Sequence, residues 1–488
     1  MLRQYKLKDY KFRLVLWVLI LSVIGIMVIG SANGSYQMKQ MIGMGVGIVF
    51  MIMVSLMDYL WISNFYWIYY IGGLVLLIAV RFFGTEVNGA KRWIDFGGFS
   101  FQPSDIMKIV VIIFFTRFFM KHEEDLNKPQ TILKAVGLVA IPWFLIYKQP
   151  DLSTSIVVLL IFCTIYFIAG LSSKIIGGMI LICIPLVVIG AMLVTQPDQK
   201  ILKGYQHDRI MGWLQPEKYP DISYQQTNSK IAIGSGQLYG KGLNNSDVNS
   251  VKNGNFIAEP QTDFIFAVAG EELGFLGCCL IVALEFLIAL ECIMVGKNAR
   301  DVSGTLICCG MAALIAFQSF INICVATGLM PNTGLPLPFV SYGLTSLISL
   351  YIGIGMVLNI GLIAHDSKKK LMQNFCIAYR GILCKNELYA TGTTGRLVEE
   401  VTNLNVHKFL AGHLGGEHQM GAQIENNQID LMIFLRNPMG AKPHEPDTKN
   451  IFRLCDMHNI PLATNLATAE LLIKSLDRGD LEWREMYK

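Results

Sequence analysis

The chain has 488 residues, of which 53% are hydrophobic and 16% charged, and its mean hydropathy is +0.47. An ordinary soluble enzyme of this length carries more charge and fewer apolar residues. The net charge of +4 is modest, and no stripe of basic and aromatic residues indicates nucleic-acid binding. Most of the chain is therefore expected to lie in a lipid bilayer.

Ten apolar runs are each long enough to cross a bilayer as a helix. They lie at residues 12–30, 40–57, 64–83, 105–120, 131–147, 153–169, 174–195, 263–296, 303–328 and 340–360. Residues 1–358 are therefore predicted to form an all-α polytopic membrane domain of about ten transmembrane helices. Of the 11 cysteines, eight fall in these runs and three in the remainder, so we interpret them as small core residues rather than as disulfides.

Charges near the ends of the runs predict the orientation of this domain. Five basic residues lie before or at the start of the first run and no small-residue cleavage site follows it, which indicates an anchor with a cytoplasmic N-terminus: Arg3, Lys6, Lys8, Lys11 and Arg13. An even number of spans returns the C-terminus to the cytoplasm and leaves the segment 196–262 outside. Lys91 and Arg92 also fall outside, against the usual bias, which suggests that they serve a polar partner.

Polar clusters flank the apolar runs, where charge is costly and is therefore a candidate for function. In "NGAKRWIDFGGFSFQPSDIMK" (88–108), Asp105 and Lys108 are three residues apart and can form an ion pair on one helix face. In "QPDLSTS" (149–155), Asp151 stands at the start of a run, and for this residue we favour helix capping over catalysis.

Two further clusters follow the long outer segment. In "EPQTDFIFAVAGEELG" (259–274), Asp263 opens a run, four residues after Glu259. A carboxylate at the boundary of water and lipid can have a raised pKa, as a general base near neutral pH requires, but on spacing alone an N-cap is an equal interpretation. In "GLMPNTGLPLPFVSYG" (328–343), prolines and glycines predict irregular backbone that must pack in protein or line a cavity.

Together and in this order, these motifs resemble the SEDS family of polytopic membrane proteins, and within it the rod-shape-determining type. The resemblance covers about residues 10–360. It implies that the chain polymerises peptidoglycan glycan strands from lipid II at the outer face of a bacterial cytoplasmic membrane during cell elongation. It also implies a class B penicillin-binding protein as the crosslinking partner.

By motif, the resemblance makes Asp263 the essential acidic residue, which takes the proton of the acceptor hydroxyl in an inverting displacement. Lys91 and Arg92, or a divalent cation such as Mg²⁺ or Mn²⁺, are expected to stabilise the pyrophosphate leaving group. The family usually has Glu at the position of Asp105, and we interpret Asp105 and Lys108 as structural coupling between spans. The alternative function is a lipid II flippase or a scaffold, which would also need many spans and buried polar residues.

From residue 359 the pattern changes to short apolar strands separated by helical stretches: "NIGLIAHD" (359–366), "ELYATGTTG" (387–395), "IDLMIFL" (429–435) and "IPLATN" (460–465). Residues 359–488 are therefore predicted to form a small α/β domain with a parallel sheet. The "TGTTG" segment has the makeup of a phosphate cradle, although an ordinary strand-to-helix turn fits as well. Lys369 adds a cation, and no fixed-offset ligand pair indicates a metal.

These segments, with "GHLGGEHQMGA" (412–422) and "PHEPD" (443–447), resemble methylglyoxal synthase in family order. The resemblance implies conversion of dihydroxyacetone phosphate to methylglyoxal and phosphate without a metal, in a tail that forms homo-oligomers. It assigns Lys369, Thr391, Gly392, Thr393 and Thr394 to the phosphate, Ala411 and Gly412 to the substrate, His365 and His444 to its oxygens, and Asp447 to a supporting position.

Two departures bear on the activity of the tail. Glu417 stands where the family has an Asp as catalytic base, and its extra methylene moves the carboxylate by roughly 1 Å, which can cost about 100-fold in rate. Asn437 replaces an Asp and removes a charge. We expect weak synthase activity, with a phosphate-ligand sensor as the alternative. Because residues 359–364 are claimed by both halves, the last span is expected to stop near Leu358.

Overall fold

The structure is a computed structural model, and it describes all residues except 1–9, 88–89, 96, 98–99, 176, 179–180, 182–184, 186–203, 246–249, 251–253, 255, 300, 365–366, 411–415, 436–447 and 488. Contacts between residues divide the chain into two compact units, Met1–Leu362 and Ile363–Lys488.

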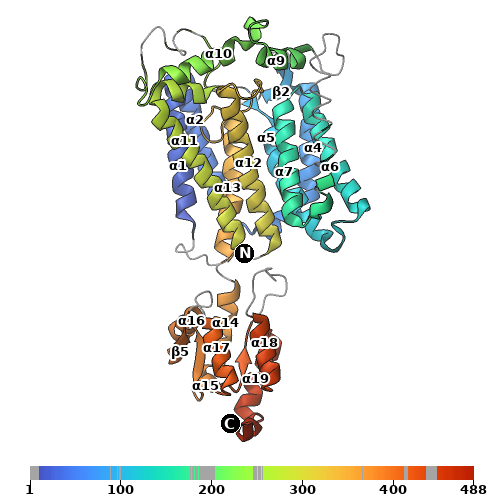
Figure 1. The fold of residues 1–488 in the computed structure, drawn as a ribbon, viewed down its shortest axis with the longest axis vertical. Coiled ribbons are helices and arrows are strands. Elements are labelled where there is room, and N and C mark those ends of the chain that lie inside the picture. The colour runs from blue at the N-terminus through green and yellow to red at the C-terminus, as the bar shows by residue number, and fades with distance from the viewer. Residues whose placement is uncertain are drawn as a thin grey trace. The chain divides into compact units, whose positions relative to one another are not determined.

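The first unit is a helical bundle (Figure 1). Its helices are α1 (Phe12–Ala32), α2 (Gly34–Ser55), α3 (Tyr59–Asn64), α4 (Tyr66–Phe83), α5 (Pro103–Lys121), α6 (Pro129–Lys148), α7 (Leu152–Ala169), α9 (Gly204–Leu214), α10 (Pro220–Ser235), α11 (Ile265–Lys297), α12 (Val302–Ala326) and α13 (Leu344–Ala364), with a short 3₁₀ turn at Glu123–Asp125. Three short antiparallel strands join α4 to α5: β1 (Thr85–Val87), β2 (Ala90–Asp95) and β3 (Ser100–Phe101).

Eight of the described helices are long and apolar enough to cross a membrane: α1, α2, α4, α6, α7, α11, α12 and α13. The predicted run 105–120 forms α5, which carries four charged residues and is buried along most of its length. It is therefore a central helix of the bundle. Most of the predicted run 174–195 lies outside the described residues. None of the ten cysteines that the structure describes forms a disulfide.

The bundle is built around α12, which packs against α11, α7 and α5. Apolar side chains on α2, α4 and α6 remain exposed, as expected for helix faces that contact lipid rather than water. Helices α9 and α10 lie across one end of the bundle, the end at which β2 also lies (Figure 1). Residues 257–263 and the proline-rich segment 331–338 meet at α12, so both predicted polar clusters reach one region.

Helix α11 is broken at Gly274, whose φ of 67° and ψ of −165° are open only to glycine. Residues 237–242 form backbone hydrogen bonds with the broken turn. The N–H groups of Lys241 and Gly242 donate to the carbonyls of Glu271 and Glu272 at 2.9 Å each, and Phe275 N–H donates to the Gln237 carbonyl at 2.8 Å. The hydrogen bonds lost by the helix are thus replaced from a loop.

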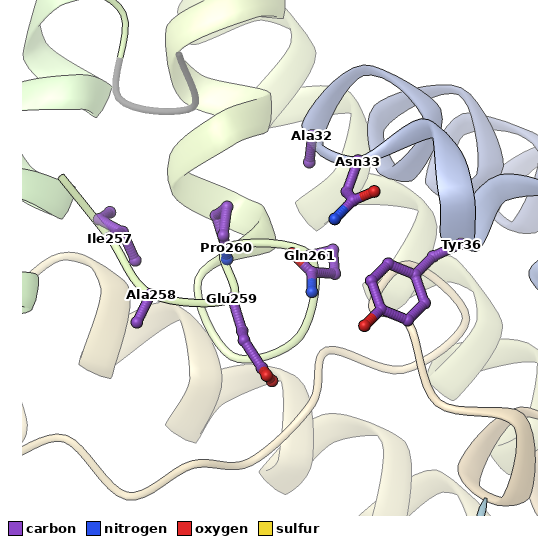
Figure 2. Close-up of a pocket in the computed structure, with 8 residues that line it drawn as sticks. All are labelled: Ala32, Asn33, Tyr36, Ile257, Ala258, Glu259, Pro260 and Gln261. Atoms are coloured by element: carbon purple, nitrogen blue, oxygen red, sulfur yellow. The ribbon is translucent and has the colours of Figure 1, made fainter. Parts of the chain in front are cut away.

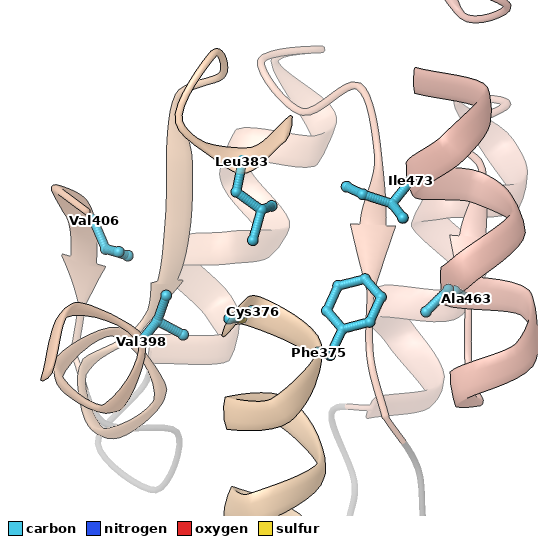
Figure 3. Packing of buried hydrophobic residues seen from close by; sticks show 8 residues of the cluster. Phe375, Cys376, Leu383, Val398, Val406, Ala463 and Ile473 are labelled. Carbon is cyan, nitrogen blue, oxygen red and sulfur yellow. The ribbon is translucent and has the colours of Figure 1, made fainter. Parts of the chain in front are cut away.

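The second unit is a small α/β domain. Its elements are α14 (Ser367–Ala378), α15 (Arg380–Leu383), β4 (Leu388–Thr391), α16 (Gly392–Thr402), β5 (Val406–Phe409), α17 (Gly416–Glu425), β6 (Met432–Ile433), α18 (Thr448–Met457), β7 (Leu462–Ala463), α19 (Leu466–Arg478) and a 3₁₀ turn at Glu482–Tyr487. The strands form two parallel pairs, β4 with β5 and β6 with β7. One apolar core contains Phe375 of α14, Val406 of β5 and Ile473 of α19 (Figure 3).

The predicted strand at 359–366 is wrong. Helix α13 continues to Ala364, so residues 359–364 are helical. Asn359 lies fully buried inside the bundle. Its side chain accepts a hydrogen bond from Tyr59 N–H at 3.0 Å and donates one to the Ser55 carbonyl at 2.8 Å. The expected end of the last span near Leu358 is wrong for the same reason. Since a buried helix and a buried strand are both continuous apolar runs, this segment did not distinguish them.

Candidate active sites

Asp263 lies in the turn that leads into α11 and is two residues before that helix begins. The N-cap of α11 is Phe264, and no side chain caps it, so the capping interpretation of Asp263 is wrong. Asn322 of α12 holds the turn in place, because its amide nitrogen donates to the Asp263 carbonyl at 2.9 Å and to the Leu335 carbonyl at 2.6 Å. One side chain thus ties α12, the Asp263 turn and the proline-rich segment together.

The proline-rich segment approaches the Asp263 carboxylate through Gly334. The φ of Gly334 is 69°, and a Cβ at this residue would lie 3.3 Å from Asp263 Oδ2. Ser153 of α7 fixes the neighbouring residue by donating from its hydroxyl to the Thr333 carbonyl at 2.5 Å. The backbone conformation therefore favours glycine here, and a larger residue would also press on the carboxylate.

Burial and four nearby charges together set the pKa of the Asp263 carboxyl. Burial raises the pKa of the Asp263 carboxyl to about 6, the positive charges of Arg209 and Arg92 lower it, and the negative charges of Glu259 and Asp151 raise it. A carboxyl with this pKa is ionised near neutral pH and is still basic enough to accept a proton. The site can therefore act as a general base beside two cations.

Arg92 and Arg209 reach the site from different elements. Arg92 of β2 donates from Nε to the Gln149 carbonyl at 3.0 Å and from Nη2 to the Pro150 carbonyl. Arg209 of α9 donates from Nη1 to the Asn332 carbonyl at 3.1 Å. The side chain of Lys91 is exposed, and because side chains alternate along a strand it lies on the other face of β2 from Arg92.

Asp151 caps α7, as predicted. Its Oδ1 accepts a hydrogen bond from Thr154 N–H at 3.2 Å, and its Oδ2 accepts from the Gln102 amide at 3.3 Å. The Asp151 carboxylate is therefore used in joining α7 to the start of α5, and it acts on Asp263 through its charge.

The expected ion pair of α5 is present and buried. Lys108 Nζ lies 2.9 Å from Asp105 Oδ1, and Lys108 also donates to Gln318 Oε1 at 2.8 Å. Gln318 of α12 in turn donates to the Pro336 carbonyl at 2.9 Å. A chain of polar contacts thus runs from α5 through α12 to the same segment that approaches Asp263.

Three buried polar atoms at this end of the bundle have no hydrogen-bond partner among the residues that the structure describes: Asn322 Oδ1, Asn332 Oδ1 and Thr333 Oγ1. Unpaired buried acceptors are rare and indicate a ligand or a water. Within the described part of the chain, no three His, Cys, Asp or Glu side chains gather as a metal site. Two arginines beside one carboxylate fit an anionic group better than a divalent cation.

The sequence interpretation missed Arg209, Asn322 and Gly334. Arg209 stands in "YQHDRI" within the long outer segment, where charge carries no topological information. Asn322 is a polar residue in the middle of an apolar run, which is a signal in itself because such residues are costly in a membrane helix. The sequence spacing offers no reason to connect any of the three with Asp263.

In the second unit, "TGTTG" joins β4 directly to α16, as predicted. Thr391 is the last residue of the strand, and its hydroxyl donates to Thr394 Oγ1 at 3.3 Å. Gly392 N–H donates to the Leu410 carbonyl at 3.3 Å, so the residues that follow β5 begin beside the start of α16. The strand ends therefore converge, as they do at ligand sites of parallel sheets.

Several predicted residues of this unit lie outside the described residues: His365, Ala411, Gly412, Asn437, His444 and Asp447. The backbones of Lys369, Thr393 and Glu417 lie in α14, α16 and α17, and their side chains are outside the described part. The N–H of Leu410, the residue before Ala411, donates a hydrogen bond to Gln419 Oε1 of α17 at 2.9 Å. The first turns of α16 and α17 thus approach the end of β5.

Comparison with known proteins identifies the first unit. Residues 11–366 match the model of the FtsW, RodA and SpoVE family, described as a cell cycle protein. The peptidoglycan glycosyltransferase MrdB of Escherichia coli is 35% identical over 367 residues, which is 74% of this chain and 95% of that protein. A chain from a peptidoglycan synthase complex, whose structure was described as coordinating polymerization and crosslinking, is 25% identical with a TM-score of 0.61 over 73% of this chain and 99% of that chain.

The second unit matches a different family. Residues 375–464 match the MGS-like domain. A methylglyoxal synthase of Caldicellulosiruptor saccharolyticus is 67% identical over 129 residues, which is 26% of this chain and 92% of that protein. The similarity therefore extends over almost a whole relative on each side of the junction between the units.

Proposed function

Because the chain belongs to the FtsW, RodA and SpoVE family and carries a methylglyoxal synthase domain at its C-terminal end, we propose that it is an enzyme with two activities. The membrane unit polymerises glycan strands from lipid II. The second unit converts dihydroxyacetone phosphate to methylglyoxal and phosphate. The domain boundary that the sequence predicts, at residues 358–359, lies inside α13, whereas the contacts between residues divide the chain after Leu362.

The raised pKa of Asp263 beside two arginines carries the first proposal. The Asp263 carboxylate takes the proton of an acceptor hydroxyl. The oxygen of that hydroxyl forms a bond to the anomeric carbon of the lipid-linked sugar, while the bond from this carbon to the pyrophosphate breaks on the opposite face. Arg92 and Arg209 stabilise the charge that develops on the pyrophosphate.

Asp263→Asn tests this assignment. The amide keeps the size of the side chain but cannot accept the proton, so glycan polymer formed from lipid II by the purified chain in detergent should fall to background. Full polymer yield from this variant would contradict the assignment and would favour the flippase or scaffold. Glu291→Gln is the matched control, because it changes a buried carboxyl of α11 far along the helix from Asp263.

The second proposal rests on the strand, the "TGTTG" turn and the helix N-terminus that follow one another at Thr391–Gly392. Backbone N–H groups and threonine hydroxyls at a helix N-terminus bind phosphate. With the phosphate held there and at Lys369, Glu417 removes a proton beside the substrate carbonyl, His365 and His444 polarise the substrate oxygens, and phosphate leaves. In the same proposal Gly412 lies beside the substrate, and Asn437 and Asp447 support the site.

Glu417→Asp tests the position of this base. It restores the family's shorter side chain, so we expect methylglyoxal formation by the full chain to rise, by up to about 100-fold. Glu417→Gln should abolish the reaction. If neither the natural chain nor Glu417→Asp forms methylglyoxal, while dihydroxyacetone phosphate still binds, the unit is a phosphate-ligand sensor.

The chain is a multi-pass membrane protein. We propose that both termini are cytoplasmic, that Asp263 faces the outside, and that a class B penicillin-binding protein crosslinks the product. Cysteine labelling of single-cysteine variants from one side of the membrane tests the orientation. Labelling near Asp263 by a reagent confined to the cytoplasm would overturn it.

A further inference from the structure

A pocket of about 450 Å³ opens between the turn from α1 to α2 and the loop that leads to Asp263 (Figure 2). Its walls come from residues 32–36 and 257–261. Pockets of this volume hold small ligands or single sugar units. The proposed chemistry at Asp263 uses none of these side chains.

Asn33 presents a hydrogen-bond donor to the pocket. Its Oδ1 accepts from Ser35 N–H at 3.1 Å and from the Ser35 hydroxyl at 2.7 Å, which fixes the oxygen at the start of α2. The amide nitrogen is therefore on the other side of the group, and Figure 2 shows it turned toward Gln261. The orientation of this amide is set by its role as the cap of α2.

Gln261 is a buried amide that lines the same pocket and is only 3% exposed. Its main-chain carbonyl accepts from Tyr342 N–H at 2.9 Å, which fixes the loop. Among the residues that the structure describes, the side-chain amide of Gln261 has no hydrogen-bond partner. The donor and the acceptor of this amide are therefore available to a ligand that carries both a carbonyl and an N–H.

Tyr36 supplies an aromatic wall. Its ring packs against Tyr342 with 4.5 Å between ring centroids, which holds it in position beside Asn33 and Gln261 (Figure 2). Glu259 stands exposed at the edge. Glu259 is the charged residue that lines the pocket in the described part of the chain, and the nearby Lys39 Nζ lies over the Tyr36 ring, 5.7 Å from its centroid. A neutral ligand with one apolar face and polar edges is therefore favoured over a phosphate.

We propose that this pocket binds an N-acetylated hexosamine unit of the glycan substrate. The ring of such a sugar stacks on Tyr36, and its acetamido group pairs with the amides of Asn33 and Gln261. The inference rests on the proposed polymerase function for the identity of the sugar. Gln261 is two residues from Asp263 in the sequence, so we expect a sugar held here to lie near the reacting carboxylate.

The test measures binding of N-acetylglucosamine trisaccharide to the full chain in detergent, with saturation-transfer NMR as the readout. We expect a signal on the acetyl methyl groups, and about tenfold weaker binding for Tyr36→Leu and for Gln261→Ala. Tyr36→Phe keeps the ring and should bind as the natural chain does. Met38→Ala, at an exposed position of α2 outside the pocket, is the control. Equal binding by Tyr36→Leu and Gln261→Ala, or equal binding of maltotriose, would overturn the proposal.

Asp263→Asn separates this inference from the proposed function. This variant should lose polymerisation and keep trisaccharide binding. The two measurements therefore test the catalytic role of Asp263 and the sugar pocket separately. The same variants identify the source of the sugar. Gln261→Ala raises the KM for lipid II if the pocket holds the lipid-linked unit, and it shortens the strands at unchanged KM if the pocket holds the growing polymer.

Discussion

At the scale of single residues, the site around Asp263 combines three opposing effects on one carboxyl. Burial raises its pKa, two arginines lower it, and two further carboxylates raise it again. The result, about 6, leaves the group ionised at neutral pH. A fully exposed Asp would be a weaker base by about two pKa units, so the surroundings make this position suitable for proton transfer.

The pKa of Asp263 predicts the pH dependence of polymerisation. Because the base must be ionised, kcat should fall about tenfold per pH unit below about 6. Removing the charge of Arg209 raises the pKa further, so Arg209→Met should move this acid limb to higher pH, while Arg209→Lys should move it less. The position of the acid limb is measured from rates of lipid II consumption between about pH 5 and pH 8. An acid limb that does not move in Arg209→Met would contradict the proximity of the two charges.

Gly334 gives a second prediction at this scale. In Gly334→Ala the new Cβ meets Asp263 Oδ2 and adopts a φ of 69°, so we expect polymerase activity to fall at least about tenfold. Gly97→Ala is the matched control, because Gly97 has a φ of 68° and a Cβ there would meet none of the described residues within 4 Å. Both variants carry a backbone cost of about 1 kcal/mol. Equal activity of the two would show that the carboxylate tolerates the contact.

Residues were predictable from sequence where their partners are local. The cap at Asp151 and the pair of Asp105 with Lys108 follow from spacings of three residues along a helix. Arg209 is 54 residues from Asp263 in the chain, and only the fold brings its charge near the carboxylate. Long-range contacts of this kind have no period in the sequence and could not be read from it.

At the scale of elements, Lys108 connects three segments, because it pairs with Asp105 and donates to Gln318, which holds the Pro336 carbonyl. Lys108→Met leaves the buried Asp105 without its cation, so we expect a loss of about 3–5 kcal/mol in the free energy of unfolding. The double variant Asp105→Asn with Lys108→Met should recover part of this loss. Thermal unfolding in detergent measures both, and a double variant no more stable than Lys108→Met would contradict the buried pair.

The break in α11 gives a second prediction about elements. Gly240 packs so closely on the broken turn that a Cβ would lie 2.1 Å from the Glu272 carbonyl oxygen. Gly240→Ala should therefore displace residues 237–242 and lower the unfolding temperature. Gly242→Ala is the matched control, since its φ of 89° is equally restricted to glycine and its Cβ would lie more than 4 Å from every neighbour in the described part of the chain. Equal unfolding temperatures would show that the loop is not anchored at Gly274.

Helices were more predictable than their ends. The apolar runs located the membrane helices, but the break at Gly274 falls inside one continuous run and depends on a loop from elsewhere in the chain. Residues 359–364 were read as a strand because their pattern satisfies both a buried strand and a buried helix. The buried hydrogen bonds of Asn359 with Tyr59 and Ser55 stabilise the helix at these residues.

At the scale of the whole molecule, two units that resemble two complete proteins share one chain. Each has its own core, and the candidate residues of each site come from its own unit. The proposed substrates are also unrelated, because one is a lipid-linked sugar outside the membrane and the other is a soluble phosphate ester in the cytoplasm. Separate cores and unrelated proposed substrates favour two reactions that do not control each other.

The last prediction is that the two activities are independent in the full chain. Asp263→Asn should abolish polymerisation and leave methylglyoxal formation unchanged, and Glu417→Gln should do the reverse. Saturating dihydroxyacetone phosphate should not change the rate of polymerisation. Because coupling of binding is reciprocal, lipid II should equally leave the affinity for dihydroxyacetone phosphate unchanged. Both reactions measured on one detergent-purified preparation decide the point: a change in polymerisation on adding dihydroxyacetone phosphate, lost in Thr391→Val, would show that the second unit regulates the first.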